Sequence, residues 1–364
     1  MRETRRAIGC MSGTSMDAVD AVLIECTGRG LEIRVRIVDA FSVTLGDLGQ
    51  RLRQIASGER VSASELSRLS LEIGERHARA VGALLAQSSG APPQLCAAHG
   101  QTLFHEPPLT WQLLNPWPIA RVFSGEIVCD LRGADAAAGG EGAPITPIAD
   151  WVMYRDPAHD RVIVNLGGFC NATHLPAGAG VGSIAGFDVC ACNHVLDGVA
   201  RRALEARFDR GGAAARRGTV DRGLADELVT ILDAQSSAGR SLGSGDEAAG
   251  WIDSACARLA PEDAAATAAS AVGSAIAAAL SARAQNAEVI LAGGGVRNAA
   301  LVEAIAAATG AARTTDELGV AAEHREGAAM GVLGLLARDG VRVTLPAVTG
   351  RDETIGREGL WIQA

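Results

Sequence analysis

The sequence predicts an α/β protein with two related lobes. Strand-like runs alternate with helical patterns along its 364 residues, which is typical of α/β chains. Two strand–turn–strand units with tight turns, at residues 7–24 and 162–175, lie far apart in the sequence. A third apolar run, at residues 289–292, leads through three glycines into a helical pattern. The recurrence of the unit is the reason to expect two lobes.

The predicted strands are short apolar runs around polar or glycine turns. The first unit has strands at 7–11 and 18–24, and the second has strands at 162–166 and 169–175. A buried-strand pattern also covers residues 95–98. Helical patterns are expected at residues 63–87, 193–208, 221–233, 264–285 and 299–308.

The composition excludes several mechanisms. All 33 Lys and Arg residues are arginines, so the lysine of a P-loop, of a protein kinase or of a Schiff-base enzyme is missing. A protein that handles phosphates without lysine must use backbone N–H groups, metal ions or arginine. The net charge of −9 argues against nucleic acid and against an anionic membrane as partners.

The cysteines and the uncharged stretch indicate a cytoplasmic protein. None of the eight cysteines forms a Cys-x-x-Cys pair, and we expect them to be small buried apolar residues in a reducing compartment. Residues 264–282 lack charge, but their only large apolar residues are Val272, Ile276 and Leu280, spaced by four. That stripe predicts a soluble helix and no membrane span.

The stretch Ser12–Asp20 is the first candidate site. Ser12, Gly13, Thr14 and Ser15 offer backbone N–H groups and hydroxyls to a phosphate, while Asp17 and Asp20 could hold Mg²⁺ directly or through water. By composition alone, an ordinary hairpin turn explains the stretch equally well.

Two glycine turns are the next candidates. Gly167 and Gly168 follow an apolar strand and allow close backbone approach to a ligand, although glycine pairs usually only make turns. Gly293, Gly294 and Gly295 lie between a strand and a helix that Asn298 would cap, which suits an anion or a nucleoside. The Gly-x-Gly-x-x-Gly pattern of dinucleotide sites is not met.

Polar residues after a buried strand form a candidate substrate site. His99, Gln101 and Thr102 follow the run at 95–98, and such positions often contact substrate. The alternative is a loop with one structural histidine. Arg132 and Asp135 could bind sugar hydroxyls or a carboxylate, or could form a surface ion pair.

Two acidic residues complete the set. Asp188 lies between a small-residue turn and an expected helix start, where a carboxylate is either a general base or an N-cap. Glu326 precedes an Ala/Met/Gly-rich helix, where an acidic residue in the first turn needs no function.

Together these stretches resemble the anhydro-N-acetylmuramic acid kinase family, which is related to levoglucosan kinase. The resemblance runs in the family's order over nearly the whole chain. The matching stretches are Gly9–Asp17, Ala98–Thr102, Asp130–Arg132, Ala143-Pro144, Asn165–Gly168, Gly186–Asp188, Gly293–Gly295, Thr315–Gly319 and Leu345–Gly350.

The resemblance implies a two-lobed actin/hexokinase/Hsp70-like (ribonuclease H-like) fold with ATP and Mg²⁺ in the interlobe cleft. The implied lobes are residues 1–140 with 341–364, and residues 141–340. The implied reaction is the hydrolytic opening and 6-phosphorylation of 1,6-anhydro-N-acetylmuramic acid in peptidoglycan recycling, by a cytoplasmic homodimer.

The resemblance also assigns roles to the candidate residues. Asp188 matches the catalytic aspartate, which deprotonates the water that attacks the anomeric carbon. Asp17 and Glu326 are the expected metal residues. The expected ATP and phosphate contacts are Ser12, Gly13, Thr14, Ser15, Asp17, Asp20, Gly167, Gly168, Gly293, Gly294, Gly295 and Asn298. The expected sugar contacts are His99, Gln101, Thr102, Arg132 and Asp135.

The segment after Asp188 departs from the family. Where the family usually has Thr-Gly-Pro-Gly after Gly-Phe-Asp, this chain has Val189-Cys190-Ala191-Cys192. If a replaced glycine needed positive φ, the new Cβ would cost about 1–2 kcal/mol or reshape the expected loop. Two alternatives therefore stay open, a kinase of the same fold for another sugar and a nucleotide-binding pseudokinase.

Overall fold

The computed structural model describes residues 4–237, 246–352 and 357–363, and it divides into two compact units. Unit 1 comprises Met1–Arg155, Gly180–Ala185 and His324–Ala364, and unit 2 comprises Asp156–Ala179 and Gly186–Glu323. These bounds differ from the expected 1–140 with 341–364 and 141–340. They differ because helices α5 (Pro147–Tyr154) and α11 (Arg325–Arg338) pack in unit 1, where α11 contacts strands β1, β2 and β4.

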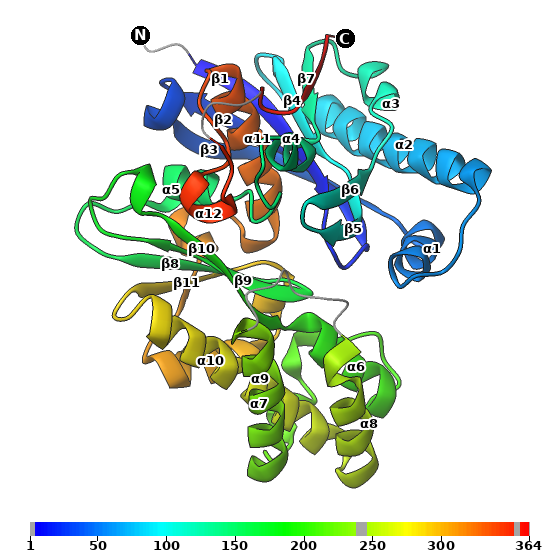
Figure 1. Cartoon of the computed structure of the whole chain (residues 1–364), viewed down its shortest axis with the longest axis vertical. Coiled ribbons are helices and arrows are strands. Elements are labelled where there is room, and N and C mark those ends of the chain that lie inside the picture. Colours follow the sequence, from blue (N-terminus) through cyan, green and yellow to red (C-terminus); the bar gives the residue numbers. More distant parts are fainter. Residues whose placement is uncertain (1–3, 238–245, 353–356, 364) are drawn as a thin grey trace. The chain divides into compact units, whose positions relative to one another are not determined.

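Unit 1 is built on a six-stranded sheet with the order β13-β7-β4-β1-β2-β3 (Figure 1). Its strands are β1 (Thr4–Ser12), β2 (Ala18–Thr27), β3 (Arg34–Thr44), β4 (Leu95–His99), β7 (Glu126–Cys129) and β13 (Leu360–Gln363). The meander β1–β2–β3 is antiparallel, whereas β4 runs parallel to both β1 and β7. The carboxyl ends of β1 and β4 therefore reach the same edge of the sheet.

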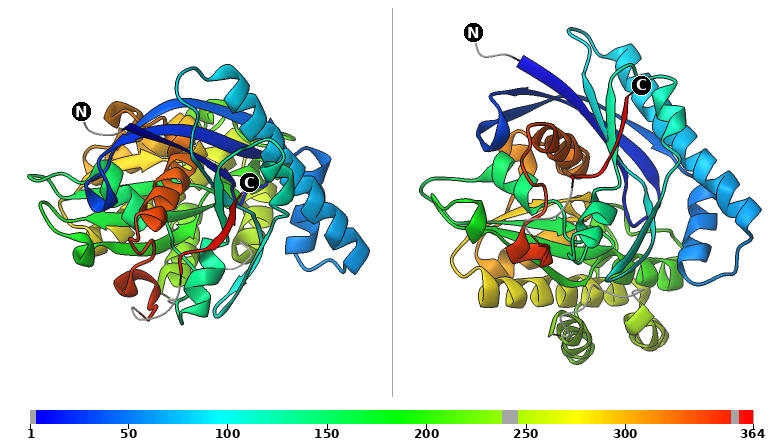
Figure 2. Two further views of the ribbon diagram at one scale, coloured as in Figure 1. Left: turned by 90° about the horizontal axis from the view of Figure 1, so that it is seen from above. Right: turned by 45° about the horizontal axis from the view of Figure 1, so that its top comes forward.

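Helices cover both faces of this sheet. Alternate residues of β1 point to opposite faces. Ile8 and Cys10 lie in a core cluster with Ile73 and Leu84 of α2 (Ala63–Gln87), while Gly9 touches α11. Figure 2 shows α11, in orange, beside the blue N-terminal strands. The remaining elements of this unit are α1 (Asp47–Ala56), α3 (Trp117–Ala120), α4 (Leu131–Ala137), α12 (Pro346–Thr349) and the hairpin β5 (Gln101–Glu106) and β6 (Leu109–Leu113).

Glycines let α11 lie directly on β1. A Cβ built on Gly9 would lie 1.9 Å from the Gly327 carbonyl oxygen and 2.3 Å from the Gly331 nitrogen. In turn, a Cβ on Gly331 would lie 2.9 Å from Ile24 Cδ1. The atoms that face Gly9 are backbone and cannot turn aside, so the close approach of α11 requires glycine at this position of β1. The approach places the first turn of α11, which carries Glu326, beside the end of β1.

Unit 2 is built on a five-stranded sheet with the order β10-β9-β8-β11-β12. Its strands are β8 (Arg161–Leu166), β9 (Phe169–Leu175), β10 (Ala185–Ala191), β11 (Glu288–Ala292) and β12 (Arg313–Thr314). Its helices are α6 (Asn193–Ala203), α7 (Arg222–Ser237), α8 (Ala249–Arg258), α9 (Pro261–Arg283) and α10 (Ala299–Thr309). Figure 1 shows α7, α9 and α10 together on one side of this sheet.

Helix α9 is the centre of the unit 2 core. It packs against α6, α7 and α10, and small residues such as Ala268 and Gly273 let these neighbours approach closely. Its length and composition match those of a membrane-spanning helix, but 72% of its most apolar window is buried inside the protein. Helix α9 is therefore a buried core helix of unit 2.

Most expected helices and strands form. The differences concern where elements end and which short or edge elements were not predicted. Helix α2 and strand β9 have the predicted bounds, whereas α6 ends at Ala203 instead of Phe208. The long strand β3 was not predicted. Helix α4 was not predicted either, and it forms where the Asp130 side chain accepts a hydrogen bond from Gly133 N (3.1 Å) and caps the helix. Seven of the eight cysteines are buried, as expected, and Cys256 is half-buried.

Candidate active site

The polar stretch Ser12–Asp17 is the tight connection between β1 and β2. Met16 N donates to Gly13 O (3.1 Å), and Met16 has a left-handed φ of 53° while its side chain is buried. The Ser12 hydroxyl donates to Gln101 Oε1 (2.5 Å), which links this loop to the start of β5. The stretch is therefore both the hairpin turn and the polar loop that the sequence predicted.

The carboxylates of the first loop lie at different depths. Asp17 ends the loop with a side chain that is 47% exposed, and Arg53 Nη1 lies 3.4 Å from its Oδ1. Asp20 lies further along β2 and accepts a hydrogen bond from Ser42. Asp17 is thus the better placed of the two to meet a metal or a phosphate in solution.

Glu326 lies beside the same loop. A Cβ built on Gly13 would lie 3.8 Å from Glu326 Oε2, so the carboxylate reaches the loop backbone. Its neighbour Arg325 forms a buried bidentate ion pair with Asp150 of α5, in which Nε lies 2.9 Å from Oδ1. Because both partners are shielded from water, this pair ties the first turn of α11 to α5.

Arg132 and His99 form a polar cluster at the carboxyl edge of the sheet. Arg132 donates from Nε to His99 Nε2 (2.9 Å) and from Nη1 to Gly142 O (3.1 Å). His99 Nδ1 lies 2.7 Å from Gly100 O, so the neutral ring donates there and accepts from Arg132. Burial, together with the Arg132 charge, lowers the pKa of His99 to about 3. His99 is therefore neutral at pH 7 and orients Arg132.

The hairpin β5–β6 adds further polar groups to this cluster. His105 Nδ1 and Gln112 Nε2 both contact Thr110 Oγ1, at 3.0 and 2.8 Å. Burial and the Arg132 charge lower the pKa of His105 to about 4. Thr102 lies in the same hairpin, where its carbonyl accepts a hydrogen bond from Gln101 Nε2 (3.2 Å).

Asp135 does not present its carboxylate to solvent. The side chain is fully buried, Oδ2 accepts from Gly142 N (2.7 Å), and Oδ1 accepts from Thr349 Oγ1 (2.9 Å). Arg351 Nη1 lies 3.9 Å from the same Oδ1. In place of the expected sugar contact, we assign Asp135 the role of holding Gly142, and through it Arg132, in position.

In unit 2, the Gly167-Gly168 turn lies against the first turn of α6. The turn carbonyls accept hydrogen bonds from Cys192 N (2.9 Å, to Gly168 O) and Asn193 N (3.0 Å, to Gly167 O). Carbonyl and N–H point in opposite directions across a trans peptide. The N–H groups that follow these carbonyls are therefore turned away from α6, where an anion could approach them.

The glycines after β11 pack against the end of β8. Gly293 has a φ of 83°, and a Cβ there would lie 2.7 Å from Asn165 Oδ1. A Cβ on Gly295 would lie 2.6 Å from Leu166 Cβ and 3.2 Å from Asn193 Oδ1. The two predicted glycine turns therefore meet in unit 2. Asn298 caps α10 as predicted, with its Oδ1 accepting from Leu301 N (3.2 Å).

Asp188 lies in strand β10 and is half-buried, which corrects the expectation of a helix N-cap. Its backbone carbonyl accepts from Arg283 Nη1 (3.4 Å), and the same guanidinium stacks on the Phe187 ring at 4.9 Å. Burial raises the pKa of a second carboxyl group, Asp197 in α6, to about 6.

The segment after Asp188 is regular structure. Val189–Ala191 completes β10, and Cys192 precedes α6 with a φ of −121°. Neither Cys190 nor Cys192 is among the described residues with positive φ. The two cysteines thus replace glycines without the backbone strain considered above, and both are buried in the unit 2 core.

Three residues that contribute to these sites could not be assigned a role from the sequence pattern. Arg53 contacts the first loop from α1, Asn193 Nδ2 donates to Leu166 O (3.1 Å), and Gly212 leaves room for Asn298. Each makes a contact between residues that are far apart in the sequence, which periodicity does not reveal.

Among the described residues, no three His, Cys, Asp or Glu side chains gather as ligands of one metal ion. A Mg²⁺ ion that keeps its waters needs only one or two carboxylates, so Asp17 and Glu326 fit that ion.

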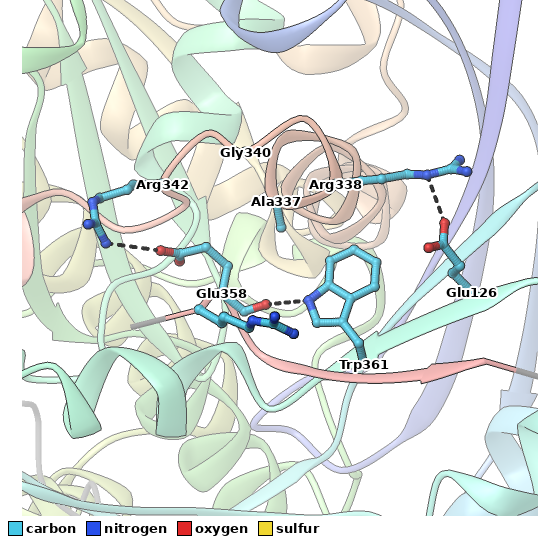
Figure 3. Close-up of a pocket in the computed structure, with 8 residues that line it drawn as sticks. Glu126, Ala337, Arg338, Gly340, Arg342, Glu358 and Trp361 are labelled. Atoms are coloured by element: carbon cyan, nitrogen blue, oxygen red, sulfur yellow. Dashed lines mark hydrogen bonds and ion pairs between the residues drawn. The ribbon is translucent and has the colours of Figure 1, made fainter. Parts of the chain in front are cut away.

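A cavity of about 560 Å³ lies away from these residues, at the C-terminal end of α11. Figure 3 shows Trp361 between two ion pairs, Arg338 with Glu126 (2.7 Å) and Arg342 with Glu358 (3.7 Å). Glu326 is at the opposite end of the helix, about 18 Å away at 1.5 Å per residue. Within unit 1, this cavity is therefore separate from Glu326 and the first loop.

Comparisons with known proteins point to one family. Residues 5–357 match the family model described as anhydro-N-acetylmuramic acid kinase. A protein of that name from Salinibacter ruber is 33% identical, and the match covers 96% of this chain and 94% of the relative. Another, from Shewanella frigidimarina, is also 33% identical, and the match covers 95% of each protein. A solved xylulose kinase from Rhodospirillum rubrum covers 99% of this chain and 94% of its own at 12% identity, with a TM-score of 0.46.

Proposed function

Because the chain belongs to the anhydro-N-acetylmuramic acid kinase family, we propose that it opens the ring of 1,6-anhydro-N-acetylmuramic acid and phosphorylates O6 with ATP. It is a phosphotransferase with an alcohol acceptor and has the two-lobed actin/hexokinase/Hsp70-like fold of sugar kinases. The observation that carries the proposal is the continuous family match over residues 5–357, a range that contains every candidate site residue.

In the proposed reaction, Asp188 is the general base. It takes a proton from a water whose oxygen bonds to the anomeric carbon of the sugar. The bond from that carbon to O6 breaks, and O6 keeps the electron pair and bonds to the γ-phosphorus of ATP. ADP leaves with the electrons of the broken bond. The half-buried position of Asp188 in the middle of strand β10 suits a base that must be held in place.

The glycine turns are proposed to bind the phosphates with backbone N–H groups. In unit 1 these N–H groups belong to the loop Ser12–Asp17. In unit 2 they belong to the Gly167-Gly168 turn, whose carbonyls accept hydrogen bonds from the backbone at the start of α6. We assign the contact with adenosine to Gly293–Gly295. Asp17 and Glu326 would hold Mg²⁺ directly or through water, and the ion would neutralise phosphate charge. Phosphoryl transfer depends mainly on such positioning and charge neutralisation, which suits a site without lysine.

Arg132 is proposed to bind the carboxylate of the muramic acid. Its guanidinium is held on one edge by His99 and on the other by Gly142 O, at 2.9 and 3.1 Å. A planar guanidinium with a defined orientation matches a carboxylate better than a mobile cation does. Thr102 is proposed to contact the sugar hydroxyls. Gln101 is fully buried and bonds to the Ser12 hydroxyl and to Thr102 O, so in place of the expected sugar contact we assign it the role of holding the first loop.

The family also supplies the setting of the proposed reaction. We place the enzyme in the cytoplasm, as a homodimer in peptidoglycan recycling. Light scattering on the purified protein tests the dimer, because a monomer at micromolar concentration contradicts it.

The segment Val189–Cys192, where the chain departs from the family, gives no support to the pseudokinase alternative, since β10 and α6 are regular there.

The test is turnover in water enriched in ¹⁸O. The protein, ATP, Mg²⁺ and the anhydro sugar should yield a sugar 6-phosphate with the label at the anomeric oxygen and none in the phosphate. Asp188→Asn should lower the rate by about 10²–10⁴-fold, the usual range for a general base. Asp197→Asn is the matched control and should retain activity. A folded wild-type protein that forms no product would refute the proposal.

A further inference from the structure

Helix α1 holds the first phosphate loop through one arginine. Arg53 Nη1 donates to Ser15 O (2.8 Å) and to Met16 O (3.0 Å), and it lies 3.4 Å from Asp17 Oδ1. A single guanidinium nitrogen therefore meets three consecutive residues of the loop. The contact joins residues 36 to 38 positions apart in sequence, all within unit 1.

The loop and α1 fit together at two further points. Leu45 N, just before α1, donates to Asp17 O (2.8 Å). Gly49 of α1 faces Met16 O so closely that a Cβ there would lie 2.1 Å from this oxygen. The left-handed φ of Met16 is thus maintained by contacts on the α1 side of the loop.

These contacts set the direction of the loop amides. The carbonyls of Ser15, Met16 and Asp17 are all bound from the α1 side, by Arg53 or by Leu45 N. In a trans peptide the N–H of the following residue points the opposite way. The N–H of Met16 closes the turn on Gly13 O (3.1 Å), so the N–H groups of Asp17 and Ala18 are the ones directed away from α1. Aligned N–H groups of this kind bind phosphate oxygens.

We infer that Arg53 is a positioning residue for the triphosphate of the nucleotide, an inference that rests on the proposed function of this loop. Arg53 does not replace the lysine of a P-loop at the phosphates. It acts from behind the loop, where it orders the peptide planes and balances the charge of Asp17 before the metal and nucleotide bind. An arginine suits the role because its planar guanidinium holds Nη1 in a fixed direction toward these acceptors, whereas an ammonium on a flexible stem is a mobile point charge.

A second arginine on the same helix provides a matched control. Arg51 bonds to Glu65 Oε1 (2.7 Å) and to Glu59 Oε1 (2.5 Å), and these partners belong to the α1–α2 region and not to the loop. Arg51→Met and Arg53→Met each remove one guanidinium from α1. Only the second removes the contacts with Ser15 and Met16.

The experiment measures binding of a non-hydrolysable ATP analogue with Mg²⁺ by calorimetry, and binding of the sugar separately. Arg53→Met should weaken nucleotide binding at least about tenfold, the expected loss for charge-assisted hydrogen bonds. Sugar binding should stay unchanged, and Arg51→Met should bind nucleotide within about twofold of wild type, as expected for a surface ion pair. Arg53→Lys should lie between, since it restores the charge but not the fixed planar geometry of the guanidinium.

The outcomes separate this inference from the proposed function. A wild-type protein that binds no nucleotide overturns both. Wild-type affinity in Arg53→Met, or equal losses in Arg51→Met and Arg53→Met, overturns the role of Arg53 alone. If Arg53→Met does not fold, Arg53→Lys decides, because a purely structural arginine predicts equal losses of nucleotide and sugar affinity.

Discussion

The contact between α11 and β1 makes Gly9→Ala a severe substitution. The new Cβ would lie 1.9 Å from Gly327 O, and Cβ contacts under 3.0 Å essentially do not occur. Both sides of the contact are backbone, so no side chain can turn aside. Helix α11 must therefore move away from the sheet by at least 1.1 Å, the difference between these two distances.

The cost of this displacement follows from what α11 buries. A gap of 0.5–1 Å removes about a quarter to a half of the dispersion energy of the atoms that face it. The apolar residues Leu333, Leu335 and Leu336 of α11 are fully buried. We expect Gly9→Ala to lower the free energy of unfolding of unit 1 by about 3–5 kcal/mol, at the upper end for overpacking.

Denaturant unfolding followed by circular dichroism measures this loss. The control is Gly82→Ala in α2, where the new Cβ lies 4.0 Å from Val122 Cβ. Alanine favours a helix over glycine, so the control should gain about 0.5–1 kcal/mol. The folded fraction of Gly9→Ala should also lose activity, because Glu326 moves with α11. A Gly9→Ala protein that unfolds within about 1 kcal/mol of wild type would refute the reasoning, because a loss that small is ordinary for a harmless substitution.

Three further predictions concern buried charge. Asp150→Ala leaves the Arg325 guanidinium buried without its carboxylate and should cost about 3–5 kcal/mol in denaturant unfolding, so a loss under about 1 kcal/mol would contradict the pairing. His99, with its pKa lowered to about 3, should show neutral-ring nitrogen shifts in NMR at pH 5. Since the unfolded chain takes up that proton below about pH 6.5, His99 should reduce stability as pH falls from there, and a charged ring at pH 5 would be inconsistent with the site. Burial opposes ionisation of Asp339, but the hydrogen bonds from Arg5 and Gly30 N, together with the charges of Arg5 and Arg29, outweigh it and lower the pKa. The resulting stability is present above about pH 4 and is lost below it, so Asp339→Asn should flatten the acid limb of a stability–pH curve.

The sequence predicts the elements of this fold better than their partners. Strand β9 and helix α2 follow from local patterns, since apolar residues recur at strand and helix periods. Strand β3 is different, because it is a half-buried edge strand in which no residue is fully buried. Its pairing with β2 stabilises it, and no local pattern expresses that pairing.

The candidate site shows the same limit. The glycine turns at Gly167-Gly168 and Gly293–Gly295 could be identified from their position after apolar runs. That Asp135 is buried against Thr349 could not, because those residues are far apart in the chain. The expected loop after Asp188 was wrong for a related reason, since a family pattern of glycines predicted a turn where Cys190 and Cys192 pack in a core.

The buried cysteines of this chain can be used to measure local opening in each unit. Cys10, Cys26, Cys96 and Cys129 belong to unit 1, and the other four cysteines belong to unit 2. Burial raises the pKa of Cys96 and Cys192 to about 12, so these thiols react with an alkylating reagent only after their surroundings open. Alkylation followed by mass spectrometry would therefore give a separate opening rate for each unit without any engineered label. It would also show whether nucleotide protects one unit, both units or neither.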